Sequence, residues 1–547
     1  MTRYPLETVV RPEVLERLAH PASAGDRKAS GTLAIESVTT PFYFLLFGAI
    51  RRAWADHVAG PALLLSVRSS NGAVGTGLAA AVKRSAPIAW LWDRPWERAY
   101  GEGVDGVAYR AATWAHPWIA LRNGFRARRI WRDMRASGRC ETSFEGVALG
   151  DLIIDSYLRF KPAPKFDIDD PFVCELIWRA LCHVEFAGAW FAKTKPRAYL
   201  TSYTTYLEHG VPVRVALREG VPVWSFGSLN RTFQRLTAEH WFHPPDTSAY
   251  RRLFDALDHR AERLAQAEAK LQSRFAGVID GATSYMRQTS YGHTSEPLPE
   301  TLRGAAVIFL HDFYDSPHVY ADLVFDDFMQ WVCTTIDTLR ANGVTVFVKP
   351  HPNQIAMSAA VLDDLKRAYP DLNWLSPSAN TVRLAQAGIA CGLTVYGTVA
   401  HELAYFGIAS ITCARHPHHS FDFCRNARTR DEYIAMLREP GKPPLTREEM
   451  REQALAFFYM HNLYGTPEEI ELRDRYTAFW RACHIGEADD ATILATLDAF
   501  VSSPGFAHMV GEIAGVVPET REAGVETLSL AQDACHSSYN NISTVKG

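Results

Sequence analysis

Short, continuous runs of apolar residues separated by longer helical segments constrain this chain of 547 residues more than any other feature. Continuous rather than alternating hydrophobicity is typical of strands that are covered on both faces, as in parallel sheets. In the first half, the candidate strands are Pro61–Val67, Pro87–Trp92, Arg197–Thr201 and Val221–Phe226. The pattern predicts α/β layering with Rossmann-like character.

The second half alternates more regularly. Strands are expected at Ala305–Leu310, Val344–Val348, Gly388–Leu393 and Ala409–Cys413, with a loop and a helix after each of the first three. This order predicts a doubly wound half. Together the halves predict an α/β fold of the GT-B type, in which two Rossmann-like domains with parallel sheets face a cleft and C-terminal helices pack around them.

A polar segment with two prolines, Ser290–Arg303, indicates the domain boundary. One long helix, Thr247–Phe275, is expected just before it. The predicted divisions are a lead-in at 1–30, an N-terminal Rossmann-like domain at 31–290, a C-terminal Rossmann-like domain at 303–440, helices at 441–503 and a loosely ordered tail at 504–547.

Composition excludes several classes of protein. Apolar residues make up 47% and charged residues 22%, which is ordinary for a globular chain. A net charge of −4 gives no reason to expect nucleic acid as a partner. The nine cysteines contain no C-x-x-C pair, so neither a disulfide framework nor a cysteine-rich zinc site is expected, and scattered thiols suit a reducing cytoplasm. No signal-peptide layout or apolar run of ~20 residues occurs, so we expect a cytoplasmic protein.

Three polar clusters follow strands of the second half, at the strand ends where open parallel sheets bind ligands. They are His311-Asp312-x-x-Asp315-x-x-His318, Lys349-x-His351-Pro352 and Gly397-Thr398-x-x-His401-Glu402. Together the clusters supply cations, an imidazole, a hydroxyl and the start of a helix. These groups favour the binding of an anion. We expect Lys349 and His351 to bind phosphate oxygens, and Glu402 to accept hydrogen bonds from ribose hydroxyls. The clusters predict a nucleotide-phosphate site.

Each cluster also has a purely structural interpretation. The prolines beside His351 would make a stiff turn, and Gly397-Thr398 would be an ordinary helix cap. The histidine-rich run Arg415–His419 suggests a metal site, but no partner cluster stands at ligand spacing, so metal binding is not predicted.

The run from Ile308 to Leu437 resembles the C-terminal half of bacterial capsule and surface-polysaccharide glycosyltransferases. The matching pieces are HDFYDSPH, FDDFMQWVCTTIDTL, VFVKPHPN, GTVAHELAYFGIASI and DEYIAML. The Lys-x-His-Pro motif is also similar to that of Kdo transferases and bacterial sialyltransferases, which use CMP-sugars. The resemblance implies a GT-B enzyme that transfers a sugar, CMP-Kdo or a similar CMP-sugar being the preferred donor, to a capsule or lipopolysaccharide acceptor. It assigns donor binding to the C-terminal domain and acceptor binding to the N-terminal domain, and it carries donor-phosphate contact to His351.

The catalytic group is left open between several side chains. Asp155 is one candidate, because Asp151, Asp155 and Arg159 stand four residues apart on one helix face. A solvated salt-bridge ladder explains the same spacing. On the cleft side, the competing candidates are His311, Asp312 and Asp315. Arg159 and His318 are candidates for substrate binding. The resemblance suggests that Arg214 holds an anionic sugar or phosphate, and a surface salt bridge is the alternative. No obligatory metal and no cofactor is expected.

Two alternative functions share these features. Teichoic-acid-type CDP-alcohol phosphotransferases carry similar motifs, and a non-enzymatic capsule assembly or export component would show no nucleotide binding. The expected partners are a nucleotide-sugar donor and a polysaccharide or lipid-linked acceptor, with no nucleic acid. The segment 114–139 carries seven arginines beside the aromatic residues Trp114, Trp118, Phe125 and Trp131. A basic segment with aromatic residues predicts a peripheral contact with the inner face of the cytoplasmic membrane. A solvated helix face with core tryptophans is the alternative.

Overall fold

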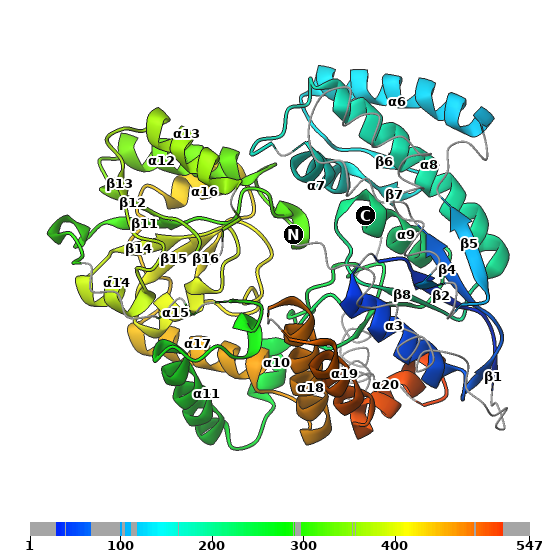
Figure 1. Ribbon diagram of the computed structural model, residues 1–547. Helices are drawn as coiled ribbons and strands as arrows, with labels where there is room; N and C mark the ends of the chain where they lie inside the picture. The colour runs from blue at the N-terminus through cyan, green and yellow to red at the C-terminus, as the bar shows by residue number, and fades with distance from the viewer. Residues whose placement is uncertain are drawn as a thin grey trace, which may run out of the picture.

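The computed structural model consists of two α/β halves that face each other, with a group of helices beneath them (Figure 1). It describes residues 29–38, 40–66, 99–100, 104–110, 117–161, 163–287, 289, 291, 297–352, 354–355, 357–485 and 488–517. Two six-stranded sheets form the centres of the halves, and most of their strands are parallel. The fold confirms the prediction of two Rossmann-like domains.

The sheet of the N-terminal half has the strand order β10-β9-β8-β2-β4-β5. All neighbours are parallel except β10 with β9. The strands are β2 (Leu33–Glu36), β4 (Ala62–Ser66), β5 (Gly106–Arg110), β8 (Ala198–Thr201), β9 (Val223–Ser225) and β10 (Gln234–Leu236). Three of the four predicted strands are therefore present, and Pro87–Trp92 lies outside the described residues.

The sheet of the C-terminal half is entirely parallel, in the order β13-β12-β11-β14-β15-β16. Its strands are β11 (Ala306–Phe309), β12 (Val346–Lys349), β13 (Asn373–Trp374), β14 (Cys391–Leu393), β15 (Ala409–Thr412) and β16 (Arg425–Asn426). Numbered along the chain, this is the order 3-2-1-4-5-6 of dinucleotide-binding sheets, whose topological switch point lies between the first and fourth strands. The switch point here lies between β11 and β14.

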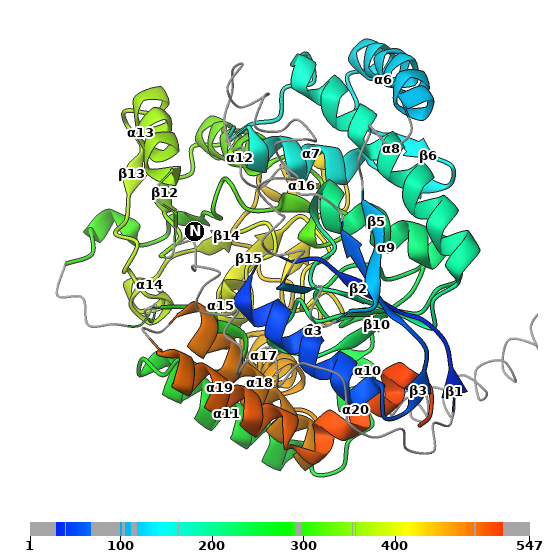
Figure 2. The ribbon, with the colours of Figure 1, turned by 45° about the vertical axis from the view of Figure 1, so that its right-hand side comes forward.

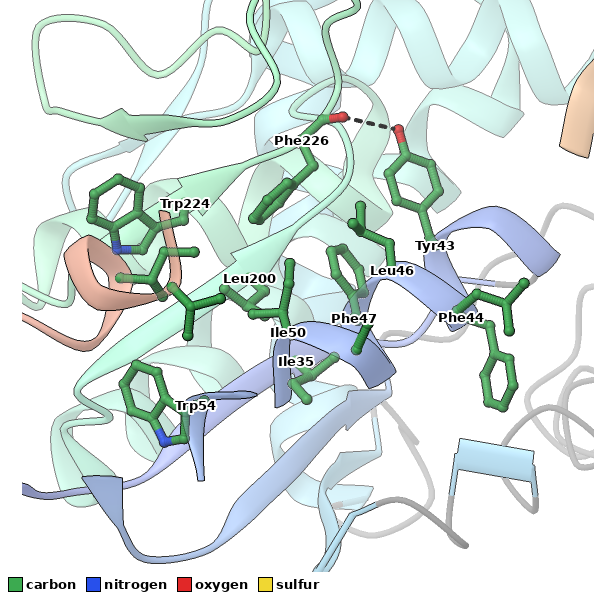
Figure 3. Close-up of a cluster of buried hydrophobic side chains, with 14 of the residues drawn as sticks. Ile35, Tyr43, Phe44, Leu46, Phe47, Ile50, Trp54, Leu200, Trp224 and Phe226 are labelled. Carbon is green, nitrogen blue, oxygen red and sulfur yellow. Dashed lines mark hydrogen bonds between the residues drawn. The ribbon is translucent and has the colours of Figure 1, made fainter. Parts of the chain in front are cut away.

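Both faces of the N-terminal sheet are buried. Leu33 and Ile35 pack into one core with α3 (Pro41–Trp54) and the C-terminal helices α18 (Pro467–His484), α19 (Asp490–Val501) and α20 (Pro504–Ala514). Figure 3 shows Phe47 and Ile50 of α3 beside Leu200 and Phe226, and the Tyr43 hydroxyl donates to the Phe226 carbonyl at 3.5 Å. The opposite face packs on α7 (Gly150–Phe160), α8 (Pro171–Thr194) and α9 (Tyr206–Arg218), with α6 (Pro117–Ser137) outside α8.

The C-terminal sheet is covered in the same way. α12 (Phe328–Ala341), α13 (Ser358–Ala368) and α16 (Arg430–Met436) share a core with one face. α14 (Thr381–Ala387) and α15 (Val399–Tyr405) contribute to the core of the other face, and α15 continues onto α11 (Arg260–Phe275) and α17 (Arg447–Asn462). Covering both faces explains why the central strands β11, β12, β14 and β15 are mostly apolar and fully buried.

Smaller elements complete the described chain. They are the parallel pair β1 (Ala29–Ser30) and β3 (Val58–Ala59), the antiparallel pair β6 (Ser143–Phe144) and β7 (Val147–Ala148), and 3-10 turns at Gly281–Thr283, Glu300–Leu302 and Pro317–Val319.

Two sequence predictions need correction. The single helix expected at Thr247–Phe275 is two helices, α10 (Tyr250–Asp255) and α11, because His259 between them has a left-handed φ of 54°. The tail expected to be loosely ordered from residue 504 begins with α20, whose Phe506 and Met509 are buried against α18 and α3. Figure 2 shows α20 and α3 lying close together from a second side.

Among the described residues, no single helix has the length and apolarity needed to cross a bilayer. The bent pair α19 and α20 meets the criterion jointly, by length and composition only, with an angle of 68° between the two helices.

Candidate functional site

A cavity of about 1160 Å³ lies between the two halves. From the C-terminal half it is lined by residues that follow β11, β12 and β14 directly, at the carboxyl ends of these strands. From the N-terminal half it is lined by Tyr203, His243 and the loop Gly227–Asn230 after β9. Of the predicted site residues, nine line it: Arg159, His311, Asp312, Asp315, Lys349, His351, Gly397, Thr398 and Glu402.

His311 sits at the switch point of the C-terminal sheet. Its Nε2 lies 3.0 Å from the hydroxyl of Thr394, which directly follows β14. The same nitrogen accepts a hydrogen bond from the Val395 amide at 3.3 Å. The ring stacks on Phe328 with a centroid distance of 4.8 Å. Burial lowers the pKa of His311 to about 3, so the ring is neutral at pH 7 and its proton is on Nδ1. His311 therefore orders the strand ends and supplies no cation.

Lys349 ends β12 and is almost wholly buried. Its Nζ donates to the carbonyl of Pro377 at 3.0 Å, and desolvation lowers the pKa of Lys349 to about 8. Two residues on, burial and the Lys349 charge lower the pKa of His351 to about 4. At pH 7 the pair thus consists of one ammonium and one neutral imidazole at the cavity wall.

The third cluster forms the turn into α15. The Gly397 amide donates to the Thr394 hydroxyl at 3.1 Å, and a Cβ on Gly397 would lie 2.6 Å from that oxygen, so only glycine fits. Thr398 is the N-cap residue of α15, but its side chain makes no capping bond. Because α15 has only seven residues, its dipole is a minor contribution, and the Thr398 hydroxyl and nearby amides are the available donors.

Glu402 lies one turn into α15 and is buried at the cavity wall. Its Oε2 already accepts hydrogen bonds from the Thr381 hydroxyl at 2.9 Å and from the Tyr291 hydroxyl. Sequence reasoning missed both hydroxyls because they come from distant segments. Glu402 also favours the charged form of Lys349.

The two cavity carboxylates after β11 differ in their surroundings. Asp312 accepts from the Tyr314 amide, the Ser358 hydroxyl and the Ile355 amide at 3.0, 3.0 and 2.7 Å, so it ties its loop to the start of α13. Asp315 accepts one bond, from the Ser316 amide at 2.9 Å, and is exposed to the cavity. Desolvation by the surrounding walls raises the pKa of Asp315. Asp315 is the better placed of the two for proton transfer.

Asp155 and His318 pair with each other and do not line the cavity. The Asp155 carboxylate lies 2.7 Å from Nδ1 of His318 and joins α7 of the N-terminal half to the loop after β11. Desolvation opposes the charged imidazole, but the Asp155 carboxylate raises the pKa of His318. The neighbouring Arg159 does line the cavity, and it donates to the Tyr314 carbonyl at 3.4 Å. The pair is thus placed as an interdomain contact.

Arg214 is engaged elsewhere. Both terminal nitrogens of its guanidinium bind Asp151, one of them also donates to the Ala148 carbonyl at 2.7 Å, and the group lies over Trp241. Because Arg214 does not line the cavity, its position gives no support to the predicted substrate role. The three residues of the predicted helix face, Asp151, Asp155 and Arg159, have separate partners and form no ladder.

One group of described side chains could hold a metal. His416, His418 and Cys424 are buried, and their ligand atoms lie within 4.8 Å of one another. The expectation that the histidine-rich run lacks a partner is therefore wrong, because Cys424 folds back onto it. Three ligands are one fewer than a structural zinc site uses, and none of the three lines the cavity.

Sequence reasoning also missed the N-terminal wall of the cavity. The loop Gly227-Ser228-Leu229-Asn230 follows β9 and could have been found by the rule that identified the C-terminal clusters. Arg274, also at the cavity wall, lies in helix α11 and does not follow a strand, so the same rule does not identify it. Its charge is paired with Asp280 and bonded to Asn462, far along the chain.

No protein-family model matches the chain, and no curated protein matches it. Among solved structures, two of UDP-GlcNAc 2-epimerase from Methanocaldococcus jannaschii are similar to it. The complex with UDP-GlcNAc and UDP is 11% identical, with 56% of this chain and 93% of that chain covered and a TM-score of 0.22. The other is 10% identical, with 77% and 97% covered and a TM-score of 0.23. Scores this low carry no inference about activity.

Proposed function

We propose that this chain is a GT-B glycosyltransferase that transfers a sugar from a nucleotide donor to a polysaccharide or lipid-linked acceptor. The observation that carries the proposal is the meeting of two strand ends in one cavity: Lys349 and His351 come from the end of β12, and Thr398 comes from the turn after β14. Two polypeptide halves enclose that cavity, so a donor and an acceptor have separate walls to bind.

The donor phosphate would lie against the C-terminal half. Lys349 donates as a point charge, His351 donates from its neutral ring, and the Thr398 hydroxyl completes the set. When the sugar departs, negative charge grows on the phosphate, and preorganised donors in a desolvated pocket stabilise it most at that moment. Glu402, held by Tyr291 and Thr381, supports the ammonium of Lys349.

Activation of the acceptor hydroxyl is assigned to Asp315. A base needs access to the substrate, and a raised pKa strengthens its hold on the proton that it takes up. Asp315 combines cavity exposure with a raised pKa. Arg159, from the opposite half, lines the same cavity, and we assign to it the binding of an anionic group of either substrate.

The sugar and acceptor come from the resemblance of the C-terminal half. CMP-Kdo or a similar CMP-sugar is the preferred donor, and a capsule or lipopolysaccharide chain in the cytoplasm is the acceptor. Transfer through side-chain donors needs no obligatory metal.

Nucleotide binding is the first test. Thermal shift with CMP, CDP and UDP should show stabilisation by CMP, which His351→Ala should largely remove. Incubation with CMP-Kdo should then release CMP and transfer the sugar, with kcat lowered by a factor of about 100 or more in Asp315→Asn. No shift with any nucleotide would favour a non-enzymatic capsule component. Release of CMP with a phosphodiester product from CDP-glycerol would favour a phosphotransferase.

A further inference from the structure

Helix α6 presents an apolar group to solvent. Trp118, Leu121 and Phe125 are 81%, 54% and 64% exposed, the three largest values among the large apolar side chains of the described residues. Spacings of three and four residues place them on one face of the helix. Both ribbon views show α6 at the outer edge of the N-terminal half, on the far side of α8 from the sheet (Figures 1 and 2).

The inner face of α6 is firmly attached. The Trp131 indole donates to the Ile168 carbonyl, and the Trp178 indole of α8 donates to the Ala120 carbonyl, both at 2.8 Å. Arg122 and Arg126 pair with Glu185 of α8. The exposed apolar face is therefore held rigidly outward and is not a loosely packed core helix.

The same outward face continues as a cationic surface. α6 carries six arginines and one aspartate, although the whole chain has a net charge of −4. Arg128 and Arg129 are exposed and form no ion pair with another described residue, and Arg132 forms an exposed ion pair with the adjacent Asp133. Positive charge is thus concentrated where the apolar side chains are exposed.

A groove of about 640 Å³ runs between α6 and α8 beside this surface. Trp131 and Trp178 give it apolar walls, and Arg128 and Arg132 line it as well. Guanidinium groups bind phosphate oxygens well, and aromatic side chains are favoured at the boundary between lipid headgroups and acyl chains.

We propose that the outward face of α6 docks the protein on an anionic phospholipid surface. Trp118, Leu121 and Phe125 insert at the headgroup boundary, and Arg128, Arg129 and Arg132 bind lipid phosphates. Clustered arginines alone would suit any polyanion, but rigidly exposed apolar side chains next to them fit a surface with an apolar layer beneath its charges. The proposal does not rest on the donor site, which lies in a different part of the molecule.

Vesicle co-sedimentation of the full chain tests the proposal. Binding to phosphatidylcholine vesicles should be weak, should rise when phosphatidylglycerol is included, and should fall at high salt. Arg128→Ala/Arg129→Ala should weaken binding to anionic vesicles about 5-fold per arginine, or roughly 25-fold. Trp118→Ser/Phe125→Ser should weaken it by about 10-fold or more at both salt concentrations.

Lys366→Ala/Arg367→Ala, which removes the same charge from the exposed end of α13, is the matched control and should bind as the wild type does. All variants should keep the wild-type circular dichroism spectrum, because the substituted side chains are exposed. Equal binding to neutral and anionic vesicles, or equal losses in the α6 and α13 variants, would overturn the proposal. The proposal would also be overturned if the wild-type protein did not bind vesicles but formed a concentration-dependent dimer that Trp118→Ser/Phe125→Ser abolished.

Discussion

The two halves share one strand order but use their switch points differently. Numbered along the chain, each sheet has its first strand beside its fourth, β2 beside β8 and β11 beside β14. At the C-terminal switch point, His311 and Thr394 bond to each other and line the cavity. At the N-terminal switch point, Glu36 ends β2 and does not line it.

Glu36 is satisfied entirely by its own half. Its Oε2 accepts from the Ser202 amide, the Ser202 hydroxyl and the Thr201 hydroxyl at 2.6, 2.8 and 3.1 Å. Its Oε1 pairs with His209, and despite desolvation this raises the pKa of His209. The same strand order therefore creates a crevice in each half, and the side chains at the strand ends decide whether that crevice stays open to a ligand or is closed by contacts within its own half.

The largest effect is expected from a substitution that disrupts the contacts of Glu36 at the N-terminal switch point. Glu36→Gln should lower the free energy of unfolding by about 3 kcal/mol, because it leaves buried His209 without its charged partner. Urea denaturation measures this, and Glu141→Gln, at an exposed ion pair, should change it by less than about 0.5 kcal/mol. The folded variant should bind CMP as the wild type does. Full stability with lost CMP binding would show that the N-terminal crevice is the nucleotide site.

The next largest effect concerns the crevice of the C-terminal half, which is open to the cavity. Lys349→Met should weaken CMP binding about 30-fold at pH 7, or ~2 kcal/mol, with little effect on stability. The pKa of Lys349 is lowered to about 8, so its charge is present below that pH and is lost above it. Wild-type affinity should therefore fall toward that of the variant as pH rises through about 8, while the affinity of Lys349→Met stays level. Titration calorimetry gives both curves, with Lys366→Met as the control. A wild-type affinity that does not change with pH would remove Lys349 from the site.

The open crevice was predictable from the sequence and the closed one was not. Lys349 and His351 stand at the end of one apolar strand, and Thr398 stands in the turn that follows another, so the rule for parallel sheets predicts that they meet. Glu36 also ends a strand, but its partners Thr201 and His209 lie more than 160 residues away, and no local pattern connects them. The sequence shows that a strand ends in a polar residue. Whether the side chain of that residue already has hydrogen-bond partners within the protein depends on tertiary contacts.

The same limit applies to Asp155 and Arg214, which the sequence predicted as a catalytic and a substrate-binding candidate. A charge in a helical pattern shows neither its burial nor its partner. The structure pairs them with His318 and Asp151. Helix boundaries near residue 259 and residue 504 were missed for a related reason, since a left-handed His259 and the burial of Phe506 both depend on the packed fold.

A smaller effect is expected where the halves touch. Asp155→Asn should lower the free energy of unfolding by about 1.5 kcal/mol at pH 6. Because the pKa of His318 is raised in the folded protein, the contribution of the pair is complete below the ordinary histidine pKa and is lost as pH rises through the raised value. The difference between wild type and variant should shrink by pH 9. Thermal unfolding across this range checks it, and a difference that grows with pH would contradict the ion pair.

The smallest effect compares two threonines, one at each crevice. Thr398→Val removes a hydroxyl that makes no capping bond, so stability should stay within about 0.5 kcal/mol while CMP affinity falls about 5-fold, or ~1 kcal/mol. Thr201→Val removes a hydroxyl that donates within its own half, so stability should fall by about 1 kcal/mol with CMP affinity unchanged. Thr398→Ser keeps the hydroxyl and should restore affinity. Calorimetry and urea denaturation on all three variants separate the two outcomes, because the comparison fails if both threonines affect the same quantity.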